Sequence, residues 1–272
     1  HALRVLLDES SDPIFAFFPD GMYRYVNRAF ALGVGKKPEE IIGKHIWDVF
    51  SREEADKRFA VVRWVFETGQ NRTIEVRVPR VDGDRYYLTT VKPILDEQQR
   101  VLSVICISKD ITDRKHMEER LEHMAQHDTL TDLPNRALFN DRLMKAIAQA
   151  RRDGTRLALM SIDLDRFKPV NDSFGHHVGD LLLQAAAQRM QDSIRESDSI
   201  GRIGGDEFLV LLPSIESDDD ALRVAGKIHD ALRQPFNFPD IGCLHISSCI
   251  GIAIYPDQGT SQLQLLKLAD GA

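Results

Sequence analysis

The sequence predicts an α+β or α/β fold class with two domains joined by a helix. Short apolar runs separated by turn residues in the first part of the 272-residue chain indicate an antiparallel sheet with short helices. Residues 114–127 are charged and contain no glycine or proline, which is typical of a helix. Helices then alternate with strand-length apolar runs. We therefore expect domains over residues 1–113 and 128–272, with a connecting helix over residues 114–127.

The N-terminal elements are predicted from turn residues and alternation. The runs "IFAFF" and "MYRYVN" flank Pro19, Asp20 and Gly21, whose turn chemistry suits a hairpin. Residues 36–66 predict short helices ending in a longer one that stops near Gly69. The runs "RTIEVRV", "RYYLTTVKPI" and "VLSVICIS" predict three further strands in an antiparallel meander.

This order of elements, closed by "SKDITDRK", resembles the PAS sensory family over residues 6–115. The resemblance implies a sensor domain, whose relatives hold a small ligand, flavin or haem, or only mediate dimer contacts. The sequence has no reactive flavin cysteine motif, and His45 beside Trp47 is better explained as a structural or exposed residue than as a haem ligand. The ligand of this domain therefore stays unassigned.

The connecting helix carries an apolar stripe. Met117, Leu121 and Met124 stand four and three residues apart, so they share one helix face. Such a stripe pairs with its own copy in a homodimer, as in coiled coils, or packs against its own domain.

Acidic residues follow two apolar strands in the second half. The run "RLALMSID" is typical of a strand buried on both faces, and it ends at Asp163, with Asp165 two residues on. Gly204 and Gly205 predict a hairpin turn that places Asp206 at its tip. A sheet that pairs the two segments would bring Asp163 and Asp206 to one edge, where clustered oxygen ligands select magnesium or manganese. A solvated hairpin tip is the alternative.

The segment "DRFKPVNDSFGHHVGD" is unusually polar for its place beside a core strand. Asn171 and Asp180 together offer an amide and a carboxylate, which match the carbonyl and amino-imino edge of guanine. Solvation of a loop is the alternative, and Asp180 would also serve as a cap at the start of the helix predicted for "LLLQAAAQRMQDSIR".

Composition limits the classes of partner. A net charge of -7 and a pI near 5.7 argue against a nucleic-acid polymer or an anionic membrane as partner. The cysteines Cys106, Cys243 and Cys249 are odd in number, and their apolar neighbours predict core positions. Because no apolar run is long enough to span a membrane and no signal peptide is visible, we expect a cytoplasmic fragment, excised from a longer chain that can hold membrane segments elsewhere.

Four motifs in register resemble the GGDEF diguanylate cyclase family over residues 125–272. They are "DTLTDLPNR", "DLDRFKPVND", "FGHHVGD" and "GGDEF". The resemblance implies a palm-like fold, a central sheet flanked by helices, and a homodimer in which two GTP molecules condense into cyclic di-GMP with release of pyrophosphate. Asp163, Asp206 and the Leu164 carbonyl match metal ligands, and Glu207 matches an acid tied to metal binding or to activation of the ribose 3′-hydroxyl.

The same resemblance assigns substrate and product contacts. Asn171 and Asp180 match the guanine-reading pair. The positions that match triphosphate contacts or allow close backbone approach are Phe167, Lys168, Gly204 and Gly205. Arg195 and Asp198 form the R-x-x-D spacing of an inhibitory product site, or an ordinary pair at a helix end.

One departure from the family bears on activity. Members continue past "LLKLADGA" into a helix with a lysine and an arginine that contact the triphosphate, so we expect a GGDEF domain truncated at its C-terminal end. The alternative to a cyclase is a regulatory module that binds GTP or cyclic di-GMP and controls a missing C-terminal domain, such as a phosphodiesterase.

Overall fold

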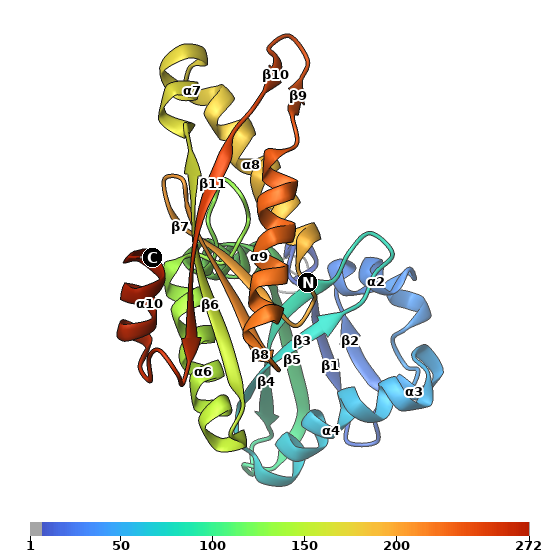
Figure 1. Cartoon of the computed structure of the whole chain (residues 1–272). Coiled ribbons are helices and arrows are strands. Elements are labelled where there is room, and N and C mark those ends of the chain that lie inside the picture. The colour runs from blue at the N-terminus through green and yellow to red at the C-terminus, as the bar shows by residue number, and fades with distance from the viewer. Residues whose placement is uncertain (1–6, 272) are drawn as a thin grey trace. The chain divides into compact units, whose positions relative to one another are not determined.

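A computed structural model describes residues 7–271 as two compact units, divided between Glu119 and Arg120 (Figure 1). Each unit has a sheet and a hydrophobic core of its own. Within residues 7–271, no helix is both long enough and apolar enough to cross a membrane.

The first unit is built on a five-stranded antiparallel sheet in the order β2-β1-β5-β4-β3. The predicted hairpin and meander are both present. Its strands are β1 (Ile14–Phe17), β2 (Tyr23–Val26), β3 (Arg72–Val78), β4 (Arg85–Leu95) and β5 (Val101–Asp110). Its helices are α2 (Arg28–Val34), η1 (Pro38–Glu40), α3 (Ile46–Val49) and α4 (Arg52–Thr68).

Local sequence explains where these helices begin and end. Gly69 caps α4 in the left-handed conformation with φ of +66°, as the sequence predicts. Helix α2 was not predicted; it has seven residues, and the buried Asn27 side chain caps its start. A core that includes Phe17, Tyr23 and Phe59 lies between the helices and the sheet.

Helix α5 (Thr112–Gln126) follows β5 and covers nearly all of the connecting helix predicted over residues 114–127. Thr112 at its start accepts a hydrogen bond from the Tyr86 amide at 3.0 Å, which attaches it to β4. The stripe is exposed, because Met117, Leu121 and Met124 are 54%, 57% and 57% accessible.

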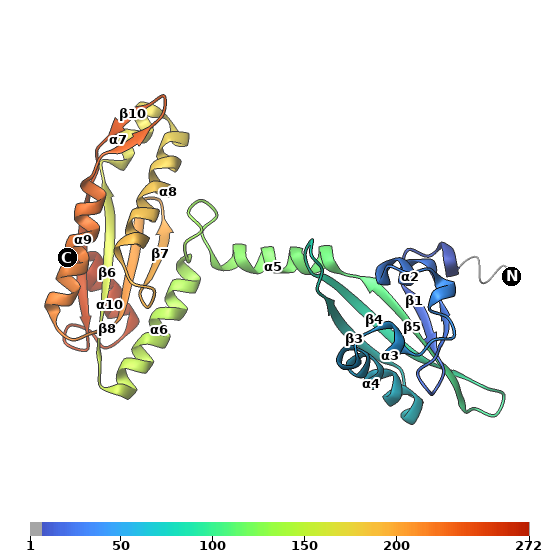
Figure 2. The ribbon, with the colours of Figure 1, turned by 90° about the vertical axis from the view of Figure 1, so that its right-hand side faces the viewer.

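The second unit is a three-layer structure (Figures 1 and 2). Its four-stranded antiparallel sheet has the order β11-β6-β8-β7, and a separate β9–β10 hairpin lies at the same end of the unit as α7. The strands are β6 (Arg156–Asp165), β7 (Ser199–Gly204), β8 (Glu207–Ile215), β9 (Phe236–Phe238), β10 (Gly242–Leu244) and β11 (Ser247–Tyr255). The helices are α6 (Arg136–Asp153), α7 (Phe167–Phe174), α8 (His176–Ser193), α9 (Asp218–Arg233) and α10 (Gln262–Gly271).

Successive side chains of β6 point to opposite faces of the sheet and so contribute to both cores of this unit. Ala158, Met160 and Ile162 belong to the core that α8 and α9 cover. Leu157 and Leu159 point the other way, into the core with α6 and α10. The prediction of a strand buried on both faces is confirmed, and the strand extends through Asp165.

Two alternatives and one expectation about this unit are wrong. The polar segment after β6 is two helices, α7 and α8, and not a loop. Asp180 does not cap α8, because α8 begins at His176 with Gly175 as its N-cap. Cys243 on β10 and Cys249 on β11 are exposed, and of the three cysteines only Cys106 is buried.

Candidate active site

The turn between β7 and β8, residues 204–207, is here called the signature turn. Gly204 pairs with Glu207 across the hairpin, so Gly205 and Asp206 form its tip. Gly205 has a φ of +52°, which a glycine adopts without steric cost. A Cβ atom added at Gly204 or Gly205 would meet no atom within 4 Å, so the space in front of the turn is open to a ligand.

The sheet brings the predicted carboxylates together. Asp163 on β6 stands opposite Glu207 on β8, and the Leu164 amide donates to the Asp206 carbonyl at 3.4 Å. Partial burial raises the pKa of the Asp163 carboxyl, and the negative charges of Asp206 and Glu207 raise it further. These three acids therefore repel one another at the end of β6.

This donor set fits a hard divalent cation. Crowded carboxylates gain from a positive charge between them, and oxygen donors suit magnesium or manganese. In the described part of the chain, no three His, Cys, Asp or Glu side chains are arranged to hold a metal ion on their own. A cation here would complete its coordination with backbone, water or substrate oxygens.

The residues predicted to read guanine lie on the neighbouring helices α7 and α8. The Oδ1 atom of Asn171 is buried without a hydrogen-bond partner. It lies 1.8 Å from where a Cβ of Gly179 would be, so the amide packs against the backbone of α8 next to Asp180. A buried amide oxygen without a hydrogen-bond partner lowers the stability of the fold, so the Asn171 side chain is a candidate for ligand binding.

The two predicted triphosphate positions begin α7. Phe167 is 9% exposed and packs in the core, which leaves only its backbone for a ligand. The Lys168 side chain is exposed. Arg166 just before them has a φ of +67°, a left-handed conformation that is unusual for a non-glycine residue.

The predicted inhibitory pair forms a turn after α8. The Asp198 carboxylate accepts the Arg195 amide at 2.9 Å, and the Asp198 amide donates to the Arg195 carbonyl at 3.0 Å. The structure does not pair the two side chains, and the Arg195 side chain is exposed.

Comparison with known families assigns both units. The family described as "Diguanylate cyclase, GGDEF domain" matches residues 125–272, more than half of the chain. The chain belongs to the GGDEF family. A family described as "PAS fold" matches residues 7–116, so a PAS domain precedes the GGDEF domain.

Two relatives are named as enzymes of cyclic di-GMP synthesis or breakdown. The chain is 45% identical over 152 residues to the diguanylate cyclase TpbB of Pseudomonas aeruginosa, covering 56% of this chain and 35% of TpbB. It is 32% identical over 271 residues to the cyclic di-GMP phosphodiesterase PdeR of Escherichia coli, covering 98% of this chain and 40% of PdeR. The chain thus spans well under half of these relatives.

A solved structure supports the fold of the GGDEF domain. The coiled coil and GGDEF domain of DgcB from Caulobacter crescentus, in complex with c-di-GMP, aligns with a TM-score of 0.54 and 25% identity. The alignment covers 60% of this chain and 85% of that one. The predicted central sheet flanked by helices is confirmed.

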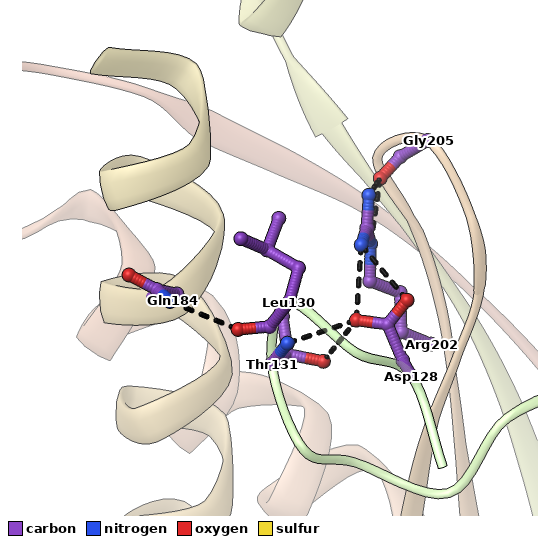
Figure 3. A network of polar contacts seen from close by, with 6 residues as sticks. All are labelled: Asp128, Leu130, Thr131, Gln184, Arg202 and Gly205. Carbon is purple, nitrogen blue, oxygen red and sulfur yellow. Dashed lines mark hydrogen bonds and ion pairs between the residues drawn. The ribbon is translucent and has the colours of Figure 1, made fainter. Parts of the chain in front are cut away.

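Two polar groupings in the GGDEF domain were not predicted from the sequence. Arg202 joins Asp128 to the signature turn (Figure 3). Asp165 accepts the Ser247 hydroxyl at 2.8 Å and lies 3.3 Å from the Cys249 sulfur. Both groupings pair residues that are far apart in the sequence, so no local sequence motif predicts them.

The PAS domain has a partly open pocket of about 140 Å³ between its sheet and helices. Its walls are mainly aliphatic and aromatic side chains from β1, β2, α2, α4 and the meander. Polar groups at the walls include Arg58, Arg80 and a Thr89–Ser108 hydroxyl pair at 2.8 Å.

Proposed function

We propose that this chain is the sensor and catalytic part of a diguanylate cyclase. The observation that carries the proposal is the crowding of Asp163, Asp206 and Glu207 at the end of β6, beside an open glycine turn. In this proposal each protomer of a homodimer binds one GTP, and the exposed stripe of α5 pairs with its copy. The DgcB structure, which joins a coiled coil to a GGDEF domain, supports this arrangement.

The reaction needs two equivalent steps. In each, the 3′-hydroxyl oxygen of one GTP attacks the α-phosphorus of the other, the bond to the β-phosphate bridging oxygen breaks, and pyrophosphate leaves. A Mg²⁺ or Mn²⁺ ion held by Asp163, Asp206 and the Leu164 carbonyl would neutralise phosphate charge. Glu207 accepts the hydroxyl proton.

The remaining site residues bind and orient GTP. The Asn171 side-chain NH₂ donates to the guanine carbonyl, and the Asp180 carboxylate accepts from the amino-imino edge. Lys168 and the Phe167 amide lie at the start of α7, where a phosphate is favoured. The glycines of the signature turn let the backbone approach the triphosphate.

A second candidate is a regulatory module that binds GTP or cyclic di-GMP without turnover. The similarity to the phosphodiesterase PdeR over 98% of the chain favours it. This module would control a phosphodiesterase elsewhere in the same protein.

One assay separates these functions. The chain is incubated with GTP and Mg²⁺, and products are identified by chromatography with mass detection. We expect cyclic di-GMP from the wild type and at least a ~100-fold loss in Asp206→Asn, while Asp230→Asn, an exposed carboxylate of α9, stays active. Guanine nucleotide that stays bound to the wild type without forming product would instead favour the regulatory module.

The same assay tests the inhibitory site. If Arg195 and Asp198 bind the product, Arg195→Ala keeps the initial rate and continues at that rate as cyclic di-GMP accumulates. If accumulating cyclic di-GMP slows the variant and the wild type equally, Arg195 and Asp198 do not form an inhibitory site.

A further inference from the structure

Arg202 and Asp128 form a largely buried ion pair that reaches the signature turn (Figure 3). Their side chains are 12% and 21% exposed. Arg202 Nη1 donates to both Asp128 carboxylate oxygens at 3.0 Å. Arg202 Nε and Nη2 donate to the Gly205 carbonyl oxygen at 2.9 and 2.8 Å. The planar guanidinium thus holds two partners at once, which a lysine ammonium cannot reproduce.

The Asp128 end of the pair is fixed in the loop that follows α5. Its carboxylate also accepts the Thr131 amide at 2.9 Å and the Thr131 hydroxyl at 2.7 Å. Partial burial disfavours the ionised form of the Asp128 carboxylate. The hydrogen bonds from Thr131 and Arg202 outweigh this effect and hold the pKa of Asp128 below its ordinary value. The carboxylate therefore stays ionised and available to Arg202 at neutral pH.

The same loop is fastened to the end of α5 and to β7. The Asn135 amide and side chain donate to the carbonyls of Gln126 and Ala125, both at 2.8 Å. The Arg202 amide donates to the Pro134 carbonyl at 3.0 Å. A continuous set of hydrogen bonds therefore runs from the last residues of α5 to the signature turn.

We propose that Arg202 is a positioning residue that holds the Gly205–Asp206 peptide and, through Asp128, couples the signature turn to the end of α5. The effect on turnover rests on the proposed function, whereas the effect on the turn does not. Because Asp128 neutralises the guanidinium, Arg202 acts by fixing geometry and not by adding positive charge for the nucleotide. Without it, the Gly205 carbonyl is released and Asp206 loses its fixed place beside Asp163.

Hydrogen exchange of the intact chain tests this role without any need for catalysis. Amide exchange is followed by mass spectrometry in peptides that contain the signature turn. We expect exchange there to be roughly tenfold faster in Arg202→Gln, because two hydrogen bonds to the turn are lost. The matched control is Arg142→Gln, since Arg142 also contacts β7, through Ser199 Oγ at 3.3 Å, but lies away from the turn.

Two further variants keep the test decisive if Arg202→Gln folds poorly. Arg202→Lys keeps the positive charge but lacks the planar guanidinium donors, so the amides of the signature turn should exchange fast in this variant as well. Asp128→Asn keeps the bonds to Gly205 and should give an intermediate rate. Wild-type exchange in Arg202→Lys would overturn the proposal.

The kinetic readout is separate from the exchange readout. With GTP and Mg²⁺, Arg202→Gln should lower kcat roughly tenfold while GTP affinity changes little, as expected for a positioning residue. If the wild type forms no cyclic di-GMP, the proposed function fails, and the exchange rates still decide the role of Arg202.

Discussion

Gly179 offers a test of the candidate guanine site with a single methyl group. A Cβ at this position would lie 1.8 Å from Asn171 Oδ1 and 3.2 Å from the Phe167 ring. We expect Gly179→Ala to push the Asn171 amide out of place and to weaken GTP binding roughly tenfold through the loss of one hydrogen-bonding group. Calorimetric titration with GTP measures the affinity, and thermal unfolding reports whether the fold is retained.

Gly226→Ala on α9 is the matched control. A Cβ at Gly226 would have no neighbour within 4 Å, so the substitution should add about 0.5–1 kcal/mol of helix stability and leave GTP binding unchanged. If both variants bind GTP like the wild type, Asn171 does not contact the nucleotide.

Residues in this site differ in how far the sequence could predict them. Asp163 and Asp206 could be predicted because each ends or interrupts an apolar run, and strand pairing then brings them together. The Arg202–Asp128 pair spans 74 residues and needs the three-dimensional fold. The exposure of Cys249 depends on which positions of β11 the fold leaves uncovered, because the same strand buries Ala253 and Tyr255.

At the scale of elements, strands and capped helices were the predictable part. Glycines in the left-handed conformation end α4 at Gly69 and α6 at Gly154, and the end near Gly69 was expected from the sequence. Helix α7 was missed because half of its eight residues are polar and only Phe167 and Val170 are buried. A helix this short is held mainly by its neighbours, so its sequence resembles a loop.

Helix α5 carries the element-scale prediction. Three apolar side chains more than half exposed are unfavourable unless a partner covers them. We expect Leu121→Asp to abolish dimerisation in analytical ultracentrifugation and to lower cyclic di-GMP formation. Pairing of two α5 helices along the stripe would remove the new carboxylate from water, which is unfavourable. GTP affinity per protomer should stay unchanged, since the GTP site lies on other elements.

The control is Glu119→Lys, which reverses a charge on the opposite face of α5 and should leave dimerisation intact. A parallel loss of dimerisation and of GTP affinity in Leu121→Asp would indicate unfolding of the domain. An unchanged dimer in that variant would show that the stripe is not the dimer interface.

At the scale of the whole molecule, the two units keep separate cores, and the family boundaries agree with this division. Fold class was predictable here because each unit has its own pattern, alternating turns and strands in one and helices with buried strands in the other. How the two units influence each other could not be predicted. The proposed coupling depends on the loop after α5, where Asn135 bonds to nearby Ala125 but Asp128 pairs with Arg202, 74 residues away.

Separate cores predict two unfolding transitions in calorimetry. Ile41→Ala, at a fully buried position of the PAS domain, should lower one transition by about 2–5 kcal/mol of stability, and Leu182→Ala in α8 should lower the other by a similar amount. GTP with Mg²⁺ should raise only the transition that Leu182→Ala lowers, since the candidate site lies wholly in the GGDEF domain. If each substitution shifts both transitions equally, the domains unfold as one cooperative unit, and the signal from the PAS domain need not pass through α5 alone.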